Sequence, residues 1–242
     1  MKLFGKNPVI ERLKSNPQSI RKIYVQTGHV DGSYIRKKAK KWGITVYGAE
    51  QSKILKMTRN LNSQGIVADV EDFKYVDYPE LLEQAKKKRI SLIFLDNLQD
   101  PQNLGAIIRS AACFGDFAIV LPKKESVGVT EVVFRIACGG DNYVSISKVS
   151  NLSNAISLAK KSGFWIVGSV VEDGEDLSEV SLPFPLGLII GSEQKGIRDV
   201  VKKQIDVKVT IPMKNVRLSF NAAQATTILC YEITRQKNKK NS

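Results

Sequence analysis

Residues 90–115, ISLIFLDNLQDPQNLGAIIRSAACFG, carry the pattern that decides the fold. They open on the apolar run ISLIFLD, which is typical of a strand buried on both faces. Asp100 followed by Pro101 predicts a helix that begins with a side-chain cap and has proline at its first position. Apolar residues then recur at three- and four-residue spacing as far as Phe114, as in a helix with one buried face. A buried strand that leads into a helix is the repeating unit of an α/β protein.

The rest of the C-terminal part repeats this unit. Apolar segments separated by helical stretches predict further strands at 116–122, 142–148, 163–171, 185–191 and 205–212, and a closing helix at about 220–236. We therefore expect an α/β fold with a doubly wound, mostly parallel sheet. In such sheets, ligands bind beyond the carboxyl ends of the strands.

The N-terminal part is predicted to be a small α/β module. Strands are expected at 20–26, 43–48 and 65–70, with helices at 33–42 and 50–60 between them. Residues 73–89 look like a connector that ends in a short charged helix. Its KKKR run at 86–89 is more often a solvated helix end than a binding site. The predicted domains are residues 1–75, a linker at 76–89, and residues 90–242.

The formal net charge of +13 is distributed unevenly along the chain. Residues 1–75 contain 15 Lys and Arg against 6 Asp and Glu, whereas residues 76–234 contain 18 of each kind. Residues 235–242 add four Lys and Arg. A basic module beside a balanced body favours nucleic-acid binding over lysine enrichment for solubility alone.

Several other classes of protein are disfavoured. Cys113, Cys138 and Cys230 have no CxxC spacing and His29 is the single histidine, so we expect neither a disulfide framework nor a metal site. The chain lacks GxGxxG and GxxxxGK[ST], which argues against a Rossmann dinucleotide site and a P-loop. No apolar run approaches the ~20 residues of a membrane-spanning helix. No signal-peptide pattern opens the chain, so we expect a soluble, cytoplasmic protein.

Three predicted strand ends are rich in polar and glycine residues. In the first, Asn103 lies at the turn into the helix, and Gly105 and Arg109 lie four residues apart on one helix face. We interpret the small glycine as leaving room for the Arg109 guanidinium. The bidentate fork of arginine suits a phosphate group, although a helix with one exposed arginine is also common.

The second strand end is LIIGSEQKGIRD, residues 188–199. Gly191 and Glu193 follow a buried strand directly, and glycine lets the backbone approach a ligand closely. Taken alone, the GxExxG pattern is a weak signal, because a tight turn before a helix would look the same.

The third strand end lies in VTIPMKNVRLSFNAAQATTILCYE, residues 209–232. A strand ends at Ile211 and Pro212, and after an irregular loop Ser219 and Asn221 stand at the start of an apolar helix. A polar pair in that position could also be a simple helix cap.

Together the three segments resemble the motifs of the SpoU (TrmH-type) RNA ribose methyltransferases. The motifs are N-x-G-x-I-x-R-x-A, then G-x-E-x-x-G, then I-P-M-x(5)-S-x-N, in this order along the chain. The resemblance covers about 90–238. Residues 3–75 are similar to the ribosomal-protein-like RNA-binding domain that precedes the catalytic domain in some members. Among members, the chain is most similar to those that methylate a guanosine ribose in bacterial large-subunit (23S) rRNA.

The resemblance implies a SPOUT-type fold with a deep trefoil knot, a homodimer, and S-adenosylmethionine as the cofactor. It makes a set of five residues candidates for the catalytic site and a further set of three candidates for cofactor binding. The catalytic set is Asn103, Arg109, Glu193, Ser219 and Asn221, and the cofactor set is Gly191, Ile211 and Phe220. Family members commonly have glycine at the position of Asn215 and leucine at that of Phe220, so this chain departs from the pattern there.

The activity implied by the resemblance is transfer of a methyl group to a ribose 2′-hydroxyl of RNA. Two alternatives stay open. One is a tRNA ribose methyltransferase, against which the separate N-terminal module favours rRNA. The other is a catalytically inactive fold that serves as an RNA-binding or ribosome-assembly factor. The presence of Arg109, Glu193 and Asn221 argues against this second alternative.

Overall fold

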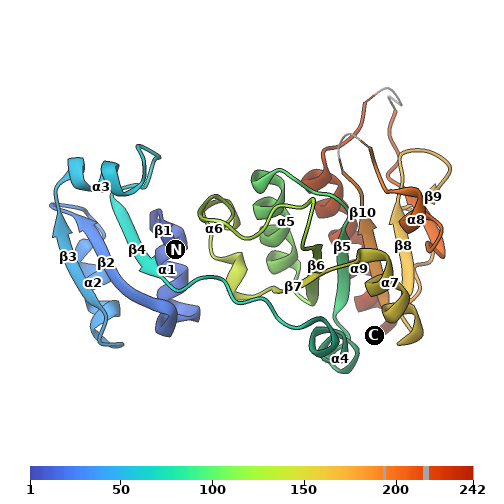
Figure 1. The fold of residues 1–242 in the computed structure, drawn as a ribbon, viewed down its shortest axis with the longest axis horizontal. Helices are drawn as coiled ribbons and strands as arrows, with labels where there is room; N and C mark the ends of the chain where they lie inside the picture. Colours follow the sequence, from blue (N-terminus) through green and yellow to red (C-terminus); the bar gives the residue numbers. More distant parts are fainter. Residues whose placement is uncertain (193–194, 215–217, 242) are drawn as a thin grey trace.

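The computed structural model describes residues 1–192, 195–214 and 218–241 of the chain. It contains two β-sheets, joined by an extended segment between β4 and α4 (Figure 1). The small sheet has the strand order β1-β4-β2-β3 and the large sheet has the order β7-β6-β5-β10-β8-β11-β9. Within the described ranges, no helix is both long and apolar enough to span a membrane.

The small sheet belongs to residues 1–75, which we call the N-terminal module. Its elements are β1 (Lys2–Phe4), α1 (Lys6–Ser15), β2 (Ile20–Gln26), α2 (Gly32–Lys40), β3 (Thr45–Ala49), α3 (Gln51–Met57) and β4 (Ile66–Val70). The strand predicted at 20–26 is confirmed, and the other predicted strands and helices of the module are found within a few residues. We did not predict β1, which pairs antiparallel with β4 at the edge of the sheet.

The large sheet is parallel at every pairing that the structure gives. Its elements are α4 (Tyr78–Lys88), β5 (Ser91–Leu95), α5 (Pro101–Phe114), β6 (Phe117–Pro122), α6 (Glu131–Ala137), the 3-10 turn η2 (Gly140–Asn142), β7 (Ser145–Val149), α7 (Leu152–Lys161), β8 (Trp165–Ser169), β9 (Glu175–Asp176), β10 (Leu186–Ile190), α8 (Asp199–Lys202), β11 (Val207–Thr210) and α9 (Ala222–Asn241). The predicted α/β class with a parallel, doubly wound sheet is confirmed. The trefoil knot stays a prediction.

The helices cover both faces of the large sheet. Leu92 and Phe94 of β5 point to the layer that contains α4 and α7, whereas Ile93 and Leu95 point to the layer of α5, α6 and α9. All four side chains are fully buried. This two-sided burial explains the continuous apolar run in the sequence, because neither face of the strand meets water.

Residues 76–89, predicted as a linker, contain a helix that packs on the large sheet. In α4, Tyr78, Leu81, Leu82 and Ala85 are buried against strands β5 and β6 and helix α7. The hydroxyl of Tyr78 donates a hydrogen bond to the backbone carbonyl of Ala155 at 2.7 Å, and burial raises the pKa of this phenol. The extended part of the connection is therefore confined to the residues between β4 and α4.

A buried ion pair joins the N-terminal module to the large sheet. Arg12 of α1 pairs with Asp141 of η2, and the two side chains are 6% and 1% exposed. The Arg12 guanidinium also lies 5.1 Å from the ring centre of Phe134 in α6. At the edge of this contact the hydroxyl of Tyr143 donates to the Glu11 carboxylate at 2.5 Å. Burial raises the pKa of Asp141, while the charge of Arg12 acts in the opposite direction.

We expect Asp141→Ala to destabilise the protein strongly. Removing one partner of a buried pair leaves an uncompensated charge, which costs roughly 3–5 kcal/mol. The free energy of unfolding from urea titration measures this loss. The control is Lys14→Ala, which breaks the exposed Lys14–Glu11 pair and should cost less than about 1 kcal/mol. A change for Asp141→Ala no larger than that of the control would contradict the importance of this contact.

Candidate functional site at the carboxyl edge of the large sheet

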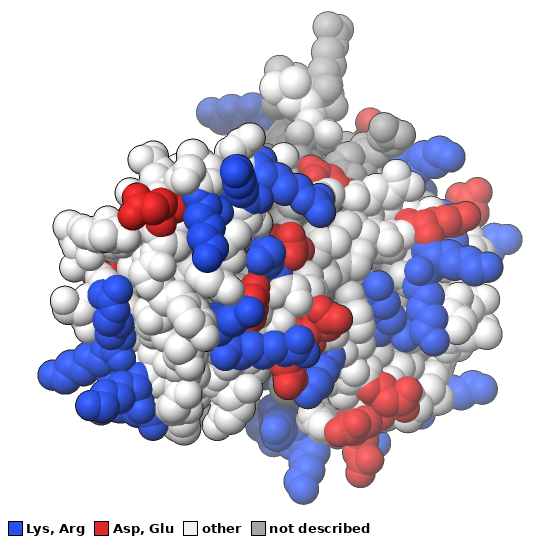
Figure 2. Space-filling model, turned by 60° about the vertical axis from the view of Figure 1, so that its left-hand side comes forward, with Lys and Arg blue, Asp and Glu red and all other residues white. Residues whose placement is uncertain are grey.

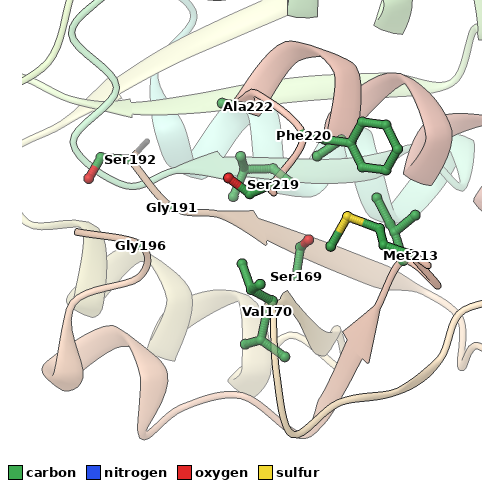
Figure 3. A pocket seen from close by; sticks show the side chains of 13 residues that line it. Ser169, Val170, Gly191, Ser192, Gly196, Met213, Ser219, Phe220 and Ala222 are labelled. Atoms are coloured by element: carbon green, nitrogen blue, oxygen red, sulfur yellow. The ribbon is translucent and has the colours of Figure 1, made fainter. Parts of the chain in front are cut away.

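A cavity of about 290 Å³ lies beyond the carboxyl ends of β8, β10 and β11. In Figure 3, Ser169 and Val170 come from the end of β8, below the end of β10, and Ser219 and Phe220 come from the segment above it that leads into α9. The lining combines apolar side chains with hydroxyl and backbone polar groups, and consists of Ser169, Val170, Val171, Ile190, Gly191, Ser192, Gly196, Ile211, Met213, Ser219, Phe220, Ala222 and Ala225. All three residues predicted to bind a cofactor, Gly191, Ile211 and Phe220, belong to this lining.

A side-chain hydrogen bond joins the first and third predicted segments. The amide nitrogen of Asn221 donates to the amide oxygen of Asn103 at 3.2 Å, and Asn103 is only 8% exposed. The Oδ1 of Asn221 also accepts a hydrogen bond from the backbone N–H of Gln224 at 2.8 Å, so it caps the start of α9. Asn221 therefore caps the helix, as one interpretation of the sequence expected, and its role in catalysis stays a prediction.

Arg109 lies on α5, two turns beyond the residues that open the helix. Its side chain is exposed and makes no hydrogen bond or ion pair with the residues that the structure describes. The backbone of α5 at Arg109 packs tightly against Gly140 of η2. A Cβ added to Gly140 would lie only 3.2 Å from the Cα of Arg109. The structure thus gives a fixed backbone that carries a guanidinium open to an anionic ligand.

The turn after β10 folds back on itself. Ser192 and Gly196 exchange two backbone hydrogen bonds, of 3.1 and 2.9 Å. A Cβ on Gly191 would lie 2.2 Å from the carbonyl carbon of Gly196, so glycine is required at position 191. The chain's own backbone accounts for this glycine, and its expected contact with a cofactor stays a prediction.

Asp96 is a buried residue that the sequence analysis did not single out, and it holds the turn after β10 in place. It is fully buried at the end of β5 and accepts hydrogen bonds from the backbone N–H of Arg198 at 2.9 Å and from its Nε at 2.7 Å. This pair attaches the turn after β10 to the end of β5. An aspartate directly after a buried strand was the available signal, but its partner lies 102 residues away.

The interpretation of Gly105 was wrong. A Cβ at this position would lie 2.5 Å from the Cβ of Ile136 and 3.1 Å from the carbonyl oxygen of Val133, both in α6. The glycine therefore permits the close packing of α5 on α6 and does not serve to make room for the guanidinium of Arg109.

Glu193 and Asn215 lie outside the described residues, so the role of Glu193 stays a prediction. Ser219 is exposed and lines the cavity. Burial raises the pKa of the Cys230 thiol in α9 to about 12, so this thiol is not a nucleophile at neutral pH. Within the described parts of the chain, no group of three or more His, Cys, Asp or Glu could hold a metal ion.

Comparison with known proteins agrees with this arrangement. The family model described as "SpoU rRNA Methylase family" matches residues 90–231, and the one described as "RNA 2'-O ribose methyltransferase substrate binding" matches residues 2–76. The chain belongs to the SpoU methylase family. The predicted resemblance is confirmed, and the two matched ranges correspond to the large sheet and the N-terminal module.

Relatives within the SpoU family span nearly the whole chain. The 23S rRNA (guanosine-2'-O-)-methyltransferase RlmB of Coxiella burnetii is 36% identical over 239 residues, which cover 97% of this chain and 95% of the relative. RlmB of Nitrosomonas europaea is 32% identical and covers 98% and 92%. The Bacillus subtilis protein YacO, whose name refers to TrmH family tRNA/rRNA methyltransferases, is 35% identical and covers 98% and 96%.

Solved structures of similar proteins have the same fold. An AdoMet-bound rRNA methyltransferase from Sinorhizobium meliloti superposes with a TM-score of 0.79 at 23% identity, and covers 97% of this chain and 86% of that chain. A TrmH family protein from Porphyromonas gingivalis gives 0.73 at 25% identity, and covers 97% and 89%. The fold of both parts of the chain is thus that of SpoU-type proteins.

We expect Gly105→Ala to lower stability. Alanine is favoured over glycine inside a helix by about 1 kcal/mol, but the added methyl group forces α5 and α6 apart, and overpacking of this kind costs about 1–3 kcal/mol. Thermal unfolding measures the net loss. The control is Gly32→Ala in α2, where the new Cβ meets the flexible end of Arg36 at 3.2 Å. A Gly105→Ala protein of unchanged stability would restore the original interpretation of this glycine.

Proposed function

We propose that this protein transfers a methyl group from S-adenosylmethionine to the 2′-hydroxyl of a guanosine ribose in bacterial 23S rRNA. The observation that carries the proposal is the hydrogen bond between Asn103 and Asn221. It joins two SpoU motifs that are far apart in the sequence beside a cavity at the sheet edge. The exposed Arg109 stands on the same helix as Asn103.

The chemistry of the cavity fits the proposed cofactor. Apolar side chains such as Val170, Met213 and Phe220 suit an adenine ring, and the hydroxyls of Ser169 and Ser219 suit the polar groups of a nucleoside and an amino acid. When bound there, S-adenosylmethionine supplies an electrophilic methyl group on its sulfonium. Gly191 and Ile211 would frame it at the ends of β10 and β11, largely through their backbone groups.

The residues around the cavity would then act on the RNA. A ribose hydroxyl is a poor nucleophile until it loses its proton, so the site has to align it and stabilise the forming alkoxide. A guanidinium stays protonated at neutral pH, so Arg109 would act as a cation and not as the base. It would clamp the adjacent phosphate and stabilise the alkoxide electrostatically. Asn103 and Glu193 would orient it, and Ser219 and Asn221 would position the ribose.

The choice of rRNA over tRNA rests on the relatives and on the N-terminal module. Two relatives that align over almost the whole chain are named for guanosine 2′-O-methylation of 23S rRNA, while YacO is named for tRNA/rRNA in general. We propose that residues 1–75 form the RNA-binding domain and residues 90–242 the methyltransferase domain. We place the protein in the cytoplasm, where rRNA is modified in bacteria.

Arg109→Ala should lower the rate of methyl transfer at least a hundredfold, because loss of one electrostatic stabiliser of a transition state costs about 10²–10³ in rate. The measurement is incorporation of radiolabelled methyl from S-adenosylmethionine into 23S rRNA and, in parallel, into tRNA. Lys161→Ala in α7 is the control, since this exposed cation lies in the helix layer on the other face of the sheet.

Both variants should unfold at the same temperature as the unaltered protein. Turnover of the Arg109 variant at the rate of the unaltered protein would exclude Arg109 as the central residue. Methyl incorporation into tRNA but not rRNA would overturn the proposed substrate. Binding of RNA with no incorporation into either would favour the inactive RNA-binding factor.

We also propose that the protein is a homodimer through α5 and α9. Their joint surface exposes Tyr231 at 57%, with its ring 6.2 Å from that of Phe114. Sedimentation equilibrium at micromolar concentration should give twice the chain mass of 26.9 kDa, and Tyr231→Glu should shift the equilibrium toward the monomer. A fully active monomer would contradict this interface.

A further inference from the structure

One face of the small sheet is partly open to solvent. The opposite face is buried under α1 and α2 through residues such as Ile23, Val25 and Ile35. On the open face, α3 covers one end by packing Ile54 against Phe4, Ala49 and Val67. The other end of the face carries no helix in the described structure.

Two cross-strand rows of side chains lie at this end. In one row, Tyr24 of β2 is paired in register with Tyr47 of β3. In the other row, Lys22 is paired with Thr45 on one side and with Asp69 on the other. Because side chains alternate along a strand, Lys22 and Tyr24 point to the same face, as do Thr45 and Tyr47.

The two tyrosines form a stacked pair. Their ring centres are 5.5 Å apart, with 28° between the planes, and Tyr47 remains 48% exposed. The ammonium groups of Lys22 and of Lys53 in α3 each lie 5.7 Å from the centre of the Tyr24 ring. The face therefore offers an open aromatic ring beside two lysines.

The charges around this pair are mostly positive. Asp69 lies 3.3 Å from the ammonium of Lys2 and 3.5 Å from that of Lys22, so one carboxylate is shared by two lysines. Lys53 is exposed and makes no ion pair in the described part of the chain. Figure 2, in which the left-hand side of Figure 1 is turned forward, shows Lys and Arg side chains in several groups over this side.

We propose that Tyr47, Tyr24, Lys22 and Lys53 form a platform for unpaired bases of the RNA substrate, with a base stacked on Tyr47 and the adjacent phosphates near the two lysines. Proteins bind single-stranded RNA by stacking bases on aromatic rings next to a basic surface. The net charge of +9 on residues 1–75 makes a polyanion the matching partner. This inference rests on the proposed function, because it names the surface through which the same protein takes its RNA.

A cross-strand aromatic pair can also serve stability alone, since such pairs contribute to sheet formation. The two roles differ in what removal of Tyr47 does to RNA. A base platform predicts lower RNA affinity at unchanged fold, whereas a stabilising pair predicts a lower unfolding temperature at unchanged affinity.

The test measures binding of the full-length protein to a 12-nucleotide oligouridylate with one 2-aminopurine, without cofactor. Tyr47→Ala should weaken binding about tenfold and remove the quenching of 2-aminopurine fluorescence that stacking produces, while Tyr47→Phe keeps both. Tyr34→Ala is the matched control. Tyr34 is 41% exposed and lies beside Lys38 at 5.6 Å, but it belongs to α2 on the opposite face of the sheet.

The salt dependence of RNA affinity distinguishes base stacking on Tyr47 from a phosphate contact of Lys53. Each phosphate contact contributes about −0.7 to the slope of log affinity against log salt for single strands. Lys53→Gln should therefore flatten the slope by about that amount, and Tyr47→Ala should leave the slope unchanged.

The proposed platform would be contradicted if Tyr47→Ala bound the RNA as tightly as the unaltered protein and quenched 2-aminopurine fluorescence to the same extent. So would a loss in Tyr34→Ala as large as that in Tyr47→Ala. Because the assay contains no cofactor and no methyl transfer, these outcomes leave the proposed methyltransferase activity to its own test.

Discussion

The pairing of β10 with both β5 and β8 is the constraint on which the site depends. Ile190 pairs with Leu95 on one side, and Leu186 pairs with Trp165 on the other. β10 lies between β5 and β8 in the sheet, although it comes later in the chain than both. Its insertion brings the turn after β10 against the end of β5, where Asp96 can hold Arg198. It also creates the sheet edge at which the segment before α9 reaches Asn103.

The large sheet could be predicted from the sequence where the information is local. The apolar run at 90–96 contains β5, and Asp100 caps α5, with its side chain accepting from the N–H of Gln102. Strand β1 was missed because three residues are too short to show an alternating pattern, and its partner β4 lies at the other end of the module. The same reason applies to the two-residue strand β9. The order of the strands in the large sheet could not be predicted. It depends on the side of β5 on which each later strand is added, and no local pattern shows this.

The site was predictable as a set of segments but not as a set of contacts. The polar strand ends indicated Asn103 and Asn221, and the structure joins them. The close neighbours that give Gly105 and Gly191 their purpose are Ile136 and Gly196, and no spacing in the sequence connects α5 with Ile136. Glycine thus marked positions of close approach correctly, while the neighbour of Gly105 was misassigned and a cofactor contact at Gly191 stays a prediction. Asp96, in contrast, was overlooked, because a single acidic residue after a strand does not indicate which residue it will bind.

The turn η2 touches both parts of the molecule with neighbouring residues. Gly140 packs against the backbone of Arg109, and Asp141 forms the buried pair with Arg12 of the N-terminal module. The placement of the N-terminal module relative to the backbone of Arg109 is therefore set by this docked turn and not by the length of the extended connection. An RNA held by the N-terminal module would present to Arg109 only a ribose at a matching distance along its backbone.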